Sequence, residues 1–152
     1  MIDGYLGDPE ATARQFRGGW FYPMDLGRLE PDGQLVFCGR ADDMMIVNGI
    51  NLYPAEVERC LMSHPAVRDC VAFPVPHPVH QDVPVCAVVV DPMIHTTAGE
   101  LRDHVCRRIG AYALGSVLIL DRIPRNAQGK PVRAELLALH RQAARSPEPP
   151  AA

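Results

Sequence analysis

The expected fold is decided by residues 44–54, which read Met-Met-Ile-Val-Asn-Gly-Ile-Asn-Leu-Tyr-Pro. Two short apolar runs, 44–47 and 50–52, flank the pair Asn48-Gly49. Because Asn-Gly tolerates the positive φ angles that a tight two-residue turn requires, this pattern predicts a β-hairpin. Pro54 suits the first position of a helix, and three apolar side chains then share one helical face: Val57, Cys60 and Leu61. An alternation of strand and helix therefore begins here.

Downstream of this stretch the alternation continues. Apolar runs rich in β-branched residues predict strands at 67–73, 85–90 and 116–120, and helical periodicity predicts helices near 99–108 and 132–144. Prolines at positions 74, 76 and 78 are expected to end the first of these strands. We therefore predict an α+β domain over residues 44–144, in which helices pack on a small, few-stranded sheet.

Upstream, the sequence predicts a short helix and a further hairpin. Within residues 5–18, Asp8 can cap a helix and Pro9 suits its first position. The turn at 30–33, Glu-Pro-Asp-Gly, joins apolar runs at 26–29 and 34–37 and predicts a hairpin too small to fold alone. The polar, glycine-led segment 39–43 is expected to be a linker, and the proline-rich tail 145–152 is expected to be disordered.

Composition excludes several classes of function. The chain has 152 residues, of which 47% are apolar and 22% charged, values that are ordinary for a globular protein with a core. A formal charge of -3 provides no basic field, so we expect neither a nucleic-acid partner nor binding to a membrane surface. The longest apolar runs fall far short of the ~20 residues of a membrane span, so none is expected. The first residues also lack the features of a secretion signal.

The cysteines indicate a reducing compartment. There are five, widely spaced and without a Cys-x-x-Cys pair, so the sequence offers no zinc knuckle or dithiol redox site. Most lie within apolar patterns, which favours buried, reduced thiols and a cytoplasmic location. The six histidines show no spacing typical of metal ligands, and we expect no metal site in this chain.

The most informative candidate for chemistry is the segment 124–131, Pro-Arg-Asn-Ala-Gln-Gly-Lys-Pro. Gly129 directly precedes Lys130 in a polar loop ahead of a helix, which predicts an ammonium group on mobile backbone. Such a cation can neutralise a carboxylate or phosphate whose charge grows in a transition state. The alternative is an ordinary solvated lysine. The segment is not a Walker loop, because the first glycine and the Ser or Thr of that motif are missing.

Three further polar residues precede the predicted domain. Asp25 can hold a sugar diol, because a carboxylate accepts hydrogen bonds from two hydroxyls, or it can be a simple turn residue. Arg40 and Asp42 either form a surface ion pair or mark a hinge at which few residues absorb a large backbone rotation.

Taken together, these signals form an ordered set of motifs. They are Gly4-Tyr-Leu-Gly-Asp-Pro-Glu-Ala-Thr12, Gly19-Trp-Phe-Tyr-Pro-Met-Asp-Leu-Gly27, Gly39-Arg-Ala-Asp-Asp-Met-Met-Ile46, Asn48-Gly-Ile-Asn-Leu-Tyr-Pro-Ala-Glu-Val-Glu58 and Pro124-Arg-Asn-Ala-Gln-Gly-Lys130. In this order they resemble the C-terminal part of AMP-forming acyl-CoA synthetases. These enzymes belong to the adenylate-forming superfamily, which also includes carrier-protein adenylation domains and luciferases. The resemblance runs from Gly4 to about His140.

The resemblance implies a two-step ligase with two domains. A large N-terminal domain binds ATP and the carboxylic acid, and a small C-terminal domain swings over it. The acid first attacks the α-phosphate to give acyl-AMP, and the thiol of CoA or of a carrier then displaces AMP. The implied cofactors are ATP/AMP and CoA, with Mg²⁺ only in the full-length enzyme, where the N-terminal domain supplies a magnesium-binding glutamate. Residues 1–38 would be the end of that domain, 39–43 the hinge and 44–144 the C-terminal mobile domain.

The resemblance also implies a role for each matched residue. Lys130 would be catalytic, bridging the carboxylate and the α-phosphate during adenylation. Asp25 would bind the ribose hydroxyls, and Arg40 would lie near the nucleotide. Asp42 would be the hinge, and Gly49 would approach the thiol tunnel, where the missing side chain lets backbone come close.

The sequence departs from the family pattern in three places. Pro23-Met24-Asp25 stands where the family has Thr-Gly-Asp, and residues 112–115, Tyr-Ala-Leu-Gly, stand where it has Tyr-Lys-x-Pro. The large N-terminal domain has no counterpart in this sequence. We therefore expect the isolated chain to be inactive.

Other readings stay open at this stage. The chain could complement a separate N-terminal domain in trans, or it could be a non-catalytic interaction module. The module could dimerise through apolar residues such as Trp20, Phe21 and Leu26. It could also be a piece of an adenylation domain that acts on a carrier protein. Ile46 stands where amino-acid adenylation domains often have a lysine, which favours CoA as the thiol. The acyl substrate is not specified by this part of the sequence.

Overall fold

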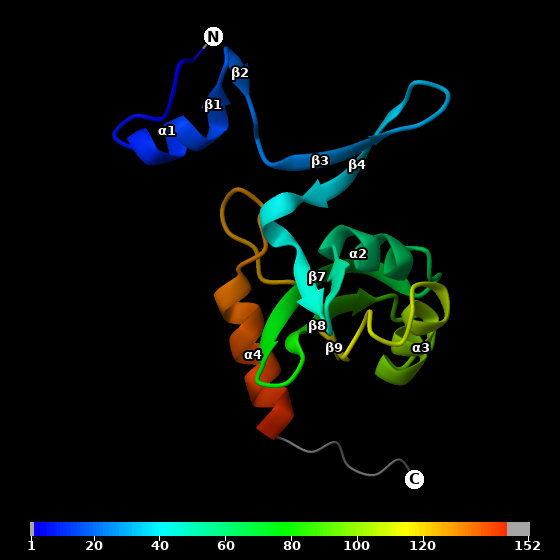
Figure 1. Cartoon of the computed structure of the whole chain (residues 1–152). Coiled ribbons are helices and arrows are strands. Elements are labelled where there is room, and N and C mark those ends of the chain that lie inside the picture. Colours follow the sequence, from blue (N-terminus) through cyan, green and yellow to red (C-terminus); the bar gives the residue numbers. More distant parts are fainter. Residues whose placement is uncertain (1, 146–152) are drawn as a thin grey trace. The chain divides into compact units, whose positions relative to one another are not determined.

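The computed structural model describes residues 2–145 and separates into two compact units, Met1–Met44 and Met45–Ala152 (Figure 1). We call them the N-terminal unit and the C-terminal unit and describe each by itself. Across residues 2–145, none of the helices combines the length and the apolar character needed to cross a bilayer.

The N-terminal unit begins with the predicted helix. Helix α1 spans Pro9–Gln15, and the side chain of Asp8 accepts a hydrogen bond of 2.8 Å from the backbone N–H of Ala11, which confirms Asp8 as the cap. Two short antiparallel strands follow, β1 (Phe16–Arg17) and β2 (Trp20–Phe21). The helix is shorter than the 5–18 segment because the chain turns into β1 at Phe16.

The predicted hairpin of this unit is confirmed. Strands β3 (Asp25–Leu29) and β4 (Leu35–Arg40) pair antiparallel, and the register places Asp25 opposite Arg40. The predicted linker 39–43 has regular local structure: its first two residues belong to β4, and the short 3₁₀ helix η1 covers Ala41–Asp43. The physical reason is continued backbone pairing, because the N–H of Ala41 donates to the carbonyl of Met24 at 2.8 Å.

The C-terminal unit is built on one five-stranded sheet. Its strand order is β6-β5-β8-β7, with β9 paired to β8 as the only parallel pair among the described strands. The strands are β5 (Met45–Val47), β6 (Ile50–Leu52), β7 (Val67–His77), β8 (Gln81–Val90) and β9 (Ser116–Ile119). The hairpin predicted around Asn48-Gly49 is confirmed as β5 and β6.

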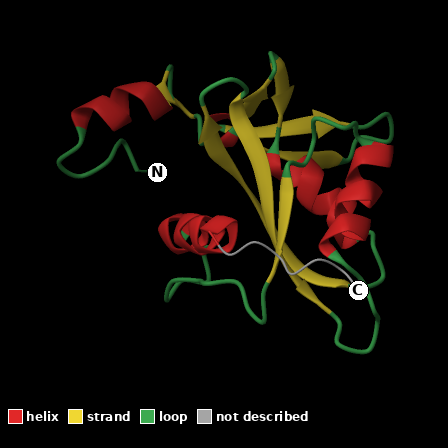
Figure 2. Ribbon diagram, turned by 90° about the horizontal axis from the view of Figure 1, so that it is seen from below, coloured by secondary structure: helices red, strands yellow, loops and turns green. Residues whose placement is uncertain are grey.

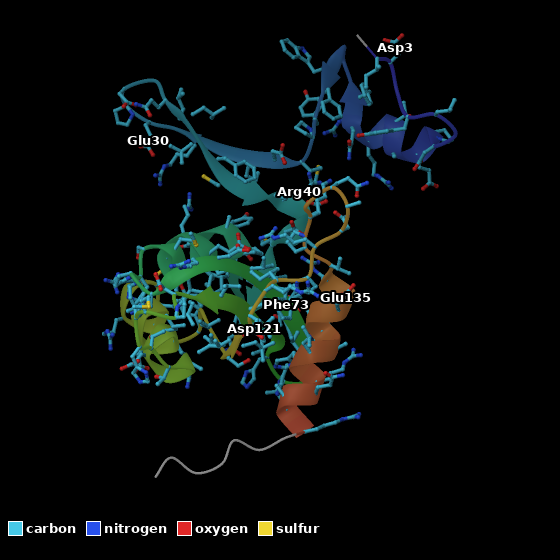
Figure 3. All side chains as sticks on the ribbon, turned by 180° about the vertical axis from the view of Figure 1, so that it is seen from behind. Asp3, Glu30, Arg40, Phe73, Asp121 and Glu135 are labelled. Atoms are coloured by element: carbon cyan, nitrogen blue, oxygen red, sulfur yellow. The ribbon has the colours of Figure 1, made fainter. Side chains whose placement is uncertain are left out.

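Helices cover both faces of this sheet. They are α2 (Pro54–Met62), α3 (Ala98–Arg108) and α4 (Arg133–Arg145), and Figure 2 shows the sheet with helices on either side. Residues of β8 alternate between the faces: Cys86 and Val88 join the core with α2 and α3, whereas Val85 and Ala87 pack with Leu136 of α4. The predicted α+β class is therefore confirmed. Phe73 of β7 lies in the core on the α4 side (Figure 3).

The predicted end of the first long strand is wrong. Strand β7 continues through Pro74 and Pro76 to His77, with Pro74 directly opposite Pro84. Two facing prolines have no N–H to exchange, so they fit only a non-hydrogen-bonded pair, and Pro76, two residues on, occupies the same kind of position. Because β7 is an edge strand, the outward side has no neighbour whose hydrogen bonds the prolines would disrupt.

Smaller differences concern the element ends. Strand β8 begins at Gln81 rather than Val85, since it pairs with the whole extended length of β7. Arg145, expected in the tail, is the last residue of α4. The rest of the predicted tail, residues 146–152, lies outside the described residues.

Candidate functional site

The loop that carries Lys130 lies between β9 and α4 and is a hydrogen-bonded turn. The N–H of Asn126 donates to the carbonyl of Lys130 at 2.8 Å, and the N–H of Gly129 donates back to the carbonyl of Asn126 at 2.9 Å. The side-chain Oδ1 of Asn126 also accepts hydrogen bonds from the N–H groups of Gln128 (3.0 Å) and Lys130 (2.9 Å). The backbone here is thus internally hydrogen-bonded, and the expectation of a mobile loop stays a prediction.

Gly129 is needed for the shape of this turn. Its φ of +78° lies in the left-handed region, and a Cβ there would meet no atom within 4 Å. The requirement is therefore conformational rather than steric, because non-glycine residues adopt this backbone geometry at a cost.

The ammonium group of Lys130 is available to bind an anion. The residue is exposed, and within residues 2–145 its side chain has no hydrogen-bond or ion-pair partner. Glu135, in the first turn of α4 just after the loop, is labelled in Figure 3. A cation held at a defined backbone position on a long, free side chain can stabilise charge that develops on a phosphate.

Arg125 fastens the same loop to the sheet. Its Nη2 donates to both carboxylate oxygens of Asp69 in β7 at 2.9 Å, and its Nη1 donates to the carbonyl of Gly129 at 3.0 Å. The sequence shows Arg125 within the 124–130 motif but indicates no role for it. The partner lies 56 positions away, so no local signal could have revealed the contact.

The structure brings together the three candidate residues of the N-terminal unit. The guanidinium of Arg40 donates to Asp42 twice, from Nε to Oδ1 and from Nη2 to Oδ2, both at 2.8 Å. Its Nη1 donates to Oδ1 of Asp25 at 3.3 Å. Hydrogen bonding to Asp42 raises the pKa of Arg40 above its ordinary value. The side chains stay 41–52% exposed, so the group is open to a polar ligand (Arg40 is labelled in Figure 3).

Met24 keeps a backbone geometry that suits glycine. Its φ is 68°, in the left-handed region, at the middle position of Pro23-Met24-Asp25. Non-glycine residues take this geometry infrequently and with strain. Met24 therefore adopts, in the middle of this turn, the left-handed backbone geometry that glycine takes without strain.

Gly49 lies at the tip of the β5–β6 hairpin. Asn48 and Gly49 have φ of 51° and 80°, as a tight two-residue hairpin turn requires, and a Cβ on Gly49 would meet nothing within 4 Å. The turn is supported from the β7–β8 connection, where Nδ1 of His80 lies 2.8 Å from Oδ1 of Asn48. Gly49 and Lys130 thus lie on two separate turns of the C-terminal unit. Within residues 2–145, no group of three or more His, Cys, Asp or Glu side chains could hold a metal ion.

The C-terminal unit thus presents two exposed turns, one with Lys130 and one with glycine at its tip. Residues 56–130 match the sequence profile of the AMP-binding enzyme C-terminal domain. The chain therefore belongs to the adenylate-forming enzymes and carries their C-terminal domain.

Curated relatives are considerably longer than this chain. Over 140 residues it is 38% identical to the 2-succinylbenzoate–CoA ligase of Geobacillus kaustophilus, covering 91% of this chain and 29% of that protein. It is 33% identical to 4-coumarate–CoA ligase 2 of Nicotiana tabacum, covering 91% of this chain and 26% of that one. The chain thus spans less than a third of the length of these relatives.

Solved structures show the same fold. The amide bond synthetase McbA from Marinactinospora thermotolerans superposes with a TM-score of 0.80 at 33% identity, over 89% of this chain and 28% of that one. The o-succinylbenzoate CoA synthetase of Bacillus subtilis, solved with its acyl-adenylate intermediate, gives a TM-score of 0.75 at 36% identity, over 88% and 27% of the two chains.

Proposed function

We propose that this chain serves as the mobile C-terminal domain of an AMP-forming acid–CoA ligase and acts together with a large adenylation domain. The observation that carries the proposal is the free, exposed ammonium of Lys130 on a hydrogen-bonded turn. The family membership and the two CoA ligases among the relatives support it.

Lys130 would act in the first step of the reaction. A carboxylate oxygen of the acid attacks the α-phosphorus of ATP, the bond from that phosphorus to the bridging oxygen breaks, and pyrophosphate leaves. Negative charge grows on the α-phosphate oxygens as the new bond forms. An ammonium positioned there lowers the barrier because it binds the transition state more strongly than the ground state.

The Asn48-Gly49 turn would act in the second step. The thiol sulfur of CoA attacks the acyl carbon of acyl-AMP, the bond from that carbon to the phosphate oxygen breaks, AMP leaves, and the thiol proton passes to solvent. An exposed tip without a side chain at Gly49 leaves room for the pantetheine arm beside the backbone.

The three polar residues of the N-terminal unit would serve the nucleotide and the domain motion. Asp25 would accept hydrogen bonds from the ribose hydroxyls, with Arg40 close to the nucleotide. Asp42 would be the hinge, in the segment 39–43. Its bidentate contact with Arg40 is exposed and can break without a large loss of stability, which suits a pivot.

The acyl acceptor is proposed to be CoA. Both curated relatives described above are CoA ligases, and Ile46 occupies the position at which amino-acid adenylation domains often have lysine. The amide bond synthetase among the similar structures makes an amine a second candidate acceptor, and a carrier-protein thiol is a third. Mg²⁺ would be bound by the large domain. All five cysteines are free, but only Cys70 and Cys86 are buried, fewer than the sequence predicts. Free thiols fit a cytoplasmic enzyme.

The test is to assay pyrophosphate release from ATP with a panel of aromatic and aliphatic acids. The chain alone is expected to release none, and the chain supplied with its large domain is expected to release it in an acid-dependent manner. Adding CoA, a pantetheinylated carrier or an amine then identifies the acceptor. Saturable release by the chain alone would contradict the proposal. A lack of stimulation of the large domain would also contradict it and would favour a non-catalytic module, including one that dimerises.

A further inference from the structure

Contacts within its loop determine the position of Lys130. The side chain of Arg125 connects this loop to the sheet. Arg125 holds Asp69 of β7 with two hydrogen bonds of 2.9 Å and, with the same guanidinium, the carbonyl of Gly129 at 3.0 Å. Gly129 is bonded covalently to Lys130. The guanidinium therefore links the edge strand of the sheet to the residue next to the candidate catalytic lysine.

We propose that Arg125, oriented by Asp69, is a positioning residue for adenylation that fixes the point from which the Lys130 side chain reaches the α-phosphate. This inference rests on the proposed function and deepens it. Arg125 would act through Lys130 and would not touch the substrate.

The geometry favours positioning over stability as the role of this contact. The side chains of Arg125 and Asp69 are 37% and 40% exposed, and exposed ion pairs contribute little to folding free energy. A planar guanidinium nevertheless allows few orientations when Nη2 contacts both oxygens of Asp69 and Nη1 donates to the Gly129 carbonyl. The third bond, to the Gly129 carbonyl, transmits that orientation to the turn. Displacement of a reacting group by about 1 Å can cost about 100-fold in rate, so a weak contact can have a large kinetic effect.

Arg68 provides a matched control for Arg125→Met, on the strand that carries Asp69. Arg68 precedes Asp69 in β7 and forms an ion pair of 2.7 Å with Asp91 rather than with the loop. Arg68→Met removes one exposed arginine and one ion pair, as Arg125→Met does, and leaves the contact with Gly129 intact.

The first measurement uses this chain alone and needs no activity. Lys130 is the only lysine, so labelling with ¹⁵N-lysine yields one backbone amide resonance, that of Lys130 itself. Arg125→Met is expected to speed hydrogen exchange of this amide by about tenfold, because the turn opens more often. Asp69→Asn should give a smaller increase, and Arg68→Met none. An unchanged exchange rate in Arg125→Met would overturn the inference.

The second measurement separates positioning from general structure in the complete enzyme. With the large domain present, Arg125→Met is expected to lower kcat for pyrophosphate release by about 10- to 100-fold, with thioester formation from supplied acyl-AMP changed by less than about threefold. Equal losses in both steps, or a loss in neither, would contradict the role. If the unmodified pair releases no pyrophosphate, the proposed function fails, while the exchange experiment still decides whether Arg125 holds the loop.

Discussion

Burial controls the titration of His104 in α3. The side chain is 7% exposed, its Nε2 lies 3.0 Å from the carbonyl of Cys60, and Arg108 Nη1 lies 2.9 Å from its Nδ1. Desolvation is the main cause that lowers the pKa of His104 below the ordinary 6.5, and the positive charge of Arg108 acts in the same direction. The hydrogen bond to Cys60 opposes them but is outweighed. The folded protein therefore favours the neutral imidazole.

The expected consequence is a loss of stability in mild acid. Because the pKa of His104 is lower in the folded state, its contribution is fully present above pH 6.5 and is lost as pH falls through the folded pKa. The carboxyls whose pKa is lowered, such as Glu100, lose their contribution only below about pH 4.5, outside this window. Urea unfolding at pH 7.5 and 5.5 checks this. His104→Gln, which keeps a donor for Cys60 and does not titrate, should flatten the difference; an equal difference in both proteins would refute it.

A second residue-scale prediction concerns the buried thiols. Burial raises the pKa of Cys70 from 9.0 to about 12, and that of Cys86 well above 9.0. At pH 8 the thiolate fraction of Cys70 is then about a thousandfold below that of an ordinary thiol. Iodoacetamide is expected to spare Cys70 and Cys86 in the folded protein and to reach the less buried Cys38 and Cys106 first. Mass spectrometry of the alkylated peptides measures the order, and early labelling of Cys70 would contradict the buried geometry.

At the scale of elements, the β5–β6 turn requires a left-handed backbone conformation at Gly49, and this requirement can be tested. Its φ is 80° and a Cβ would be in open space, so Gly49→Ala introduces backbone strain without a clash. We expect the free energy of unfolding to fall by about 1 kcal/mol, as measured by urea denaturation. The control is Gly99→Ala in α3, where the backbone is outside the left-handed region and alanine favours the helix, so stability should be unchanged or increase. Equal effects of the two substitutions would contradict this reading.

Local chemistry explains which elements could be predicted from the sequence. The Asn48-Gly49 turn and the Asp8 cap depend on residues within a few positions of one another, and the structure confirms both. The course of β7 depends on Pro84 facing Pro74, and the anchoring of the loop depends on Asp69 facing Arg125. Such contacts join distant segments, so they leave no periodic signal in either one.

The polar residues of the candidate site likewise differ in how far the local sequence could predict them. Lys130 was identified because a lysine after glycine in a polar loop is a local pattern with a chemical meaning. Asp25 and Arg40 were selected separately, and their pairing follows only from the β3–β4 register. The roles assigned to Asp25, Arg40, Asp42, Gly49 and Lys130 remain predictions.

At the scale of the whole molecule, the N-terminal unit has an apolar surface that suits a large partner domain. Exposed side chains include Trp20 at 73%, Leu29 at 70% and Leu35 at 75%. Exposed apolar side chains mark an interaction surface where they form a contiguous patch, and we propose that role for them here. The relatives are more than three times as long as this chain, so the large domain is the expected occupant and a second copy of the chain is the competing one.

The single tryptophan reports on this surface directly. Trp20 is expected to fluoresce as a solvent-exposed indole in the chain alone and to shift to shorter wavelength when the large domain is added. Trp20→Ser should weaken binding of the large domain in sedimentation velocity. A blue-shifted emission that grows with the concentration of the chain alone would instead indicate the dimer.

Lys130 is proposed to serve adenylation and not thioester formation, and the variant that separates these roles is Lys130→Ala. Pyrophosphate release and thioester formation from supplied acyl-AMP are measured in parallel on the complete enzyme. Pyrophosphate release is expected to fall by about 100-fold or more, while thioester formation stays within about threefold of the unmodified enzyme. Retention of pyrophosphate release, or an equal loss in both half-reactions, would contradict it.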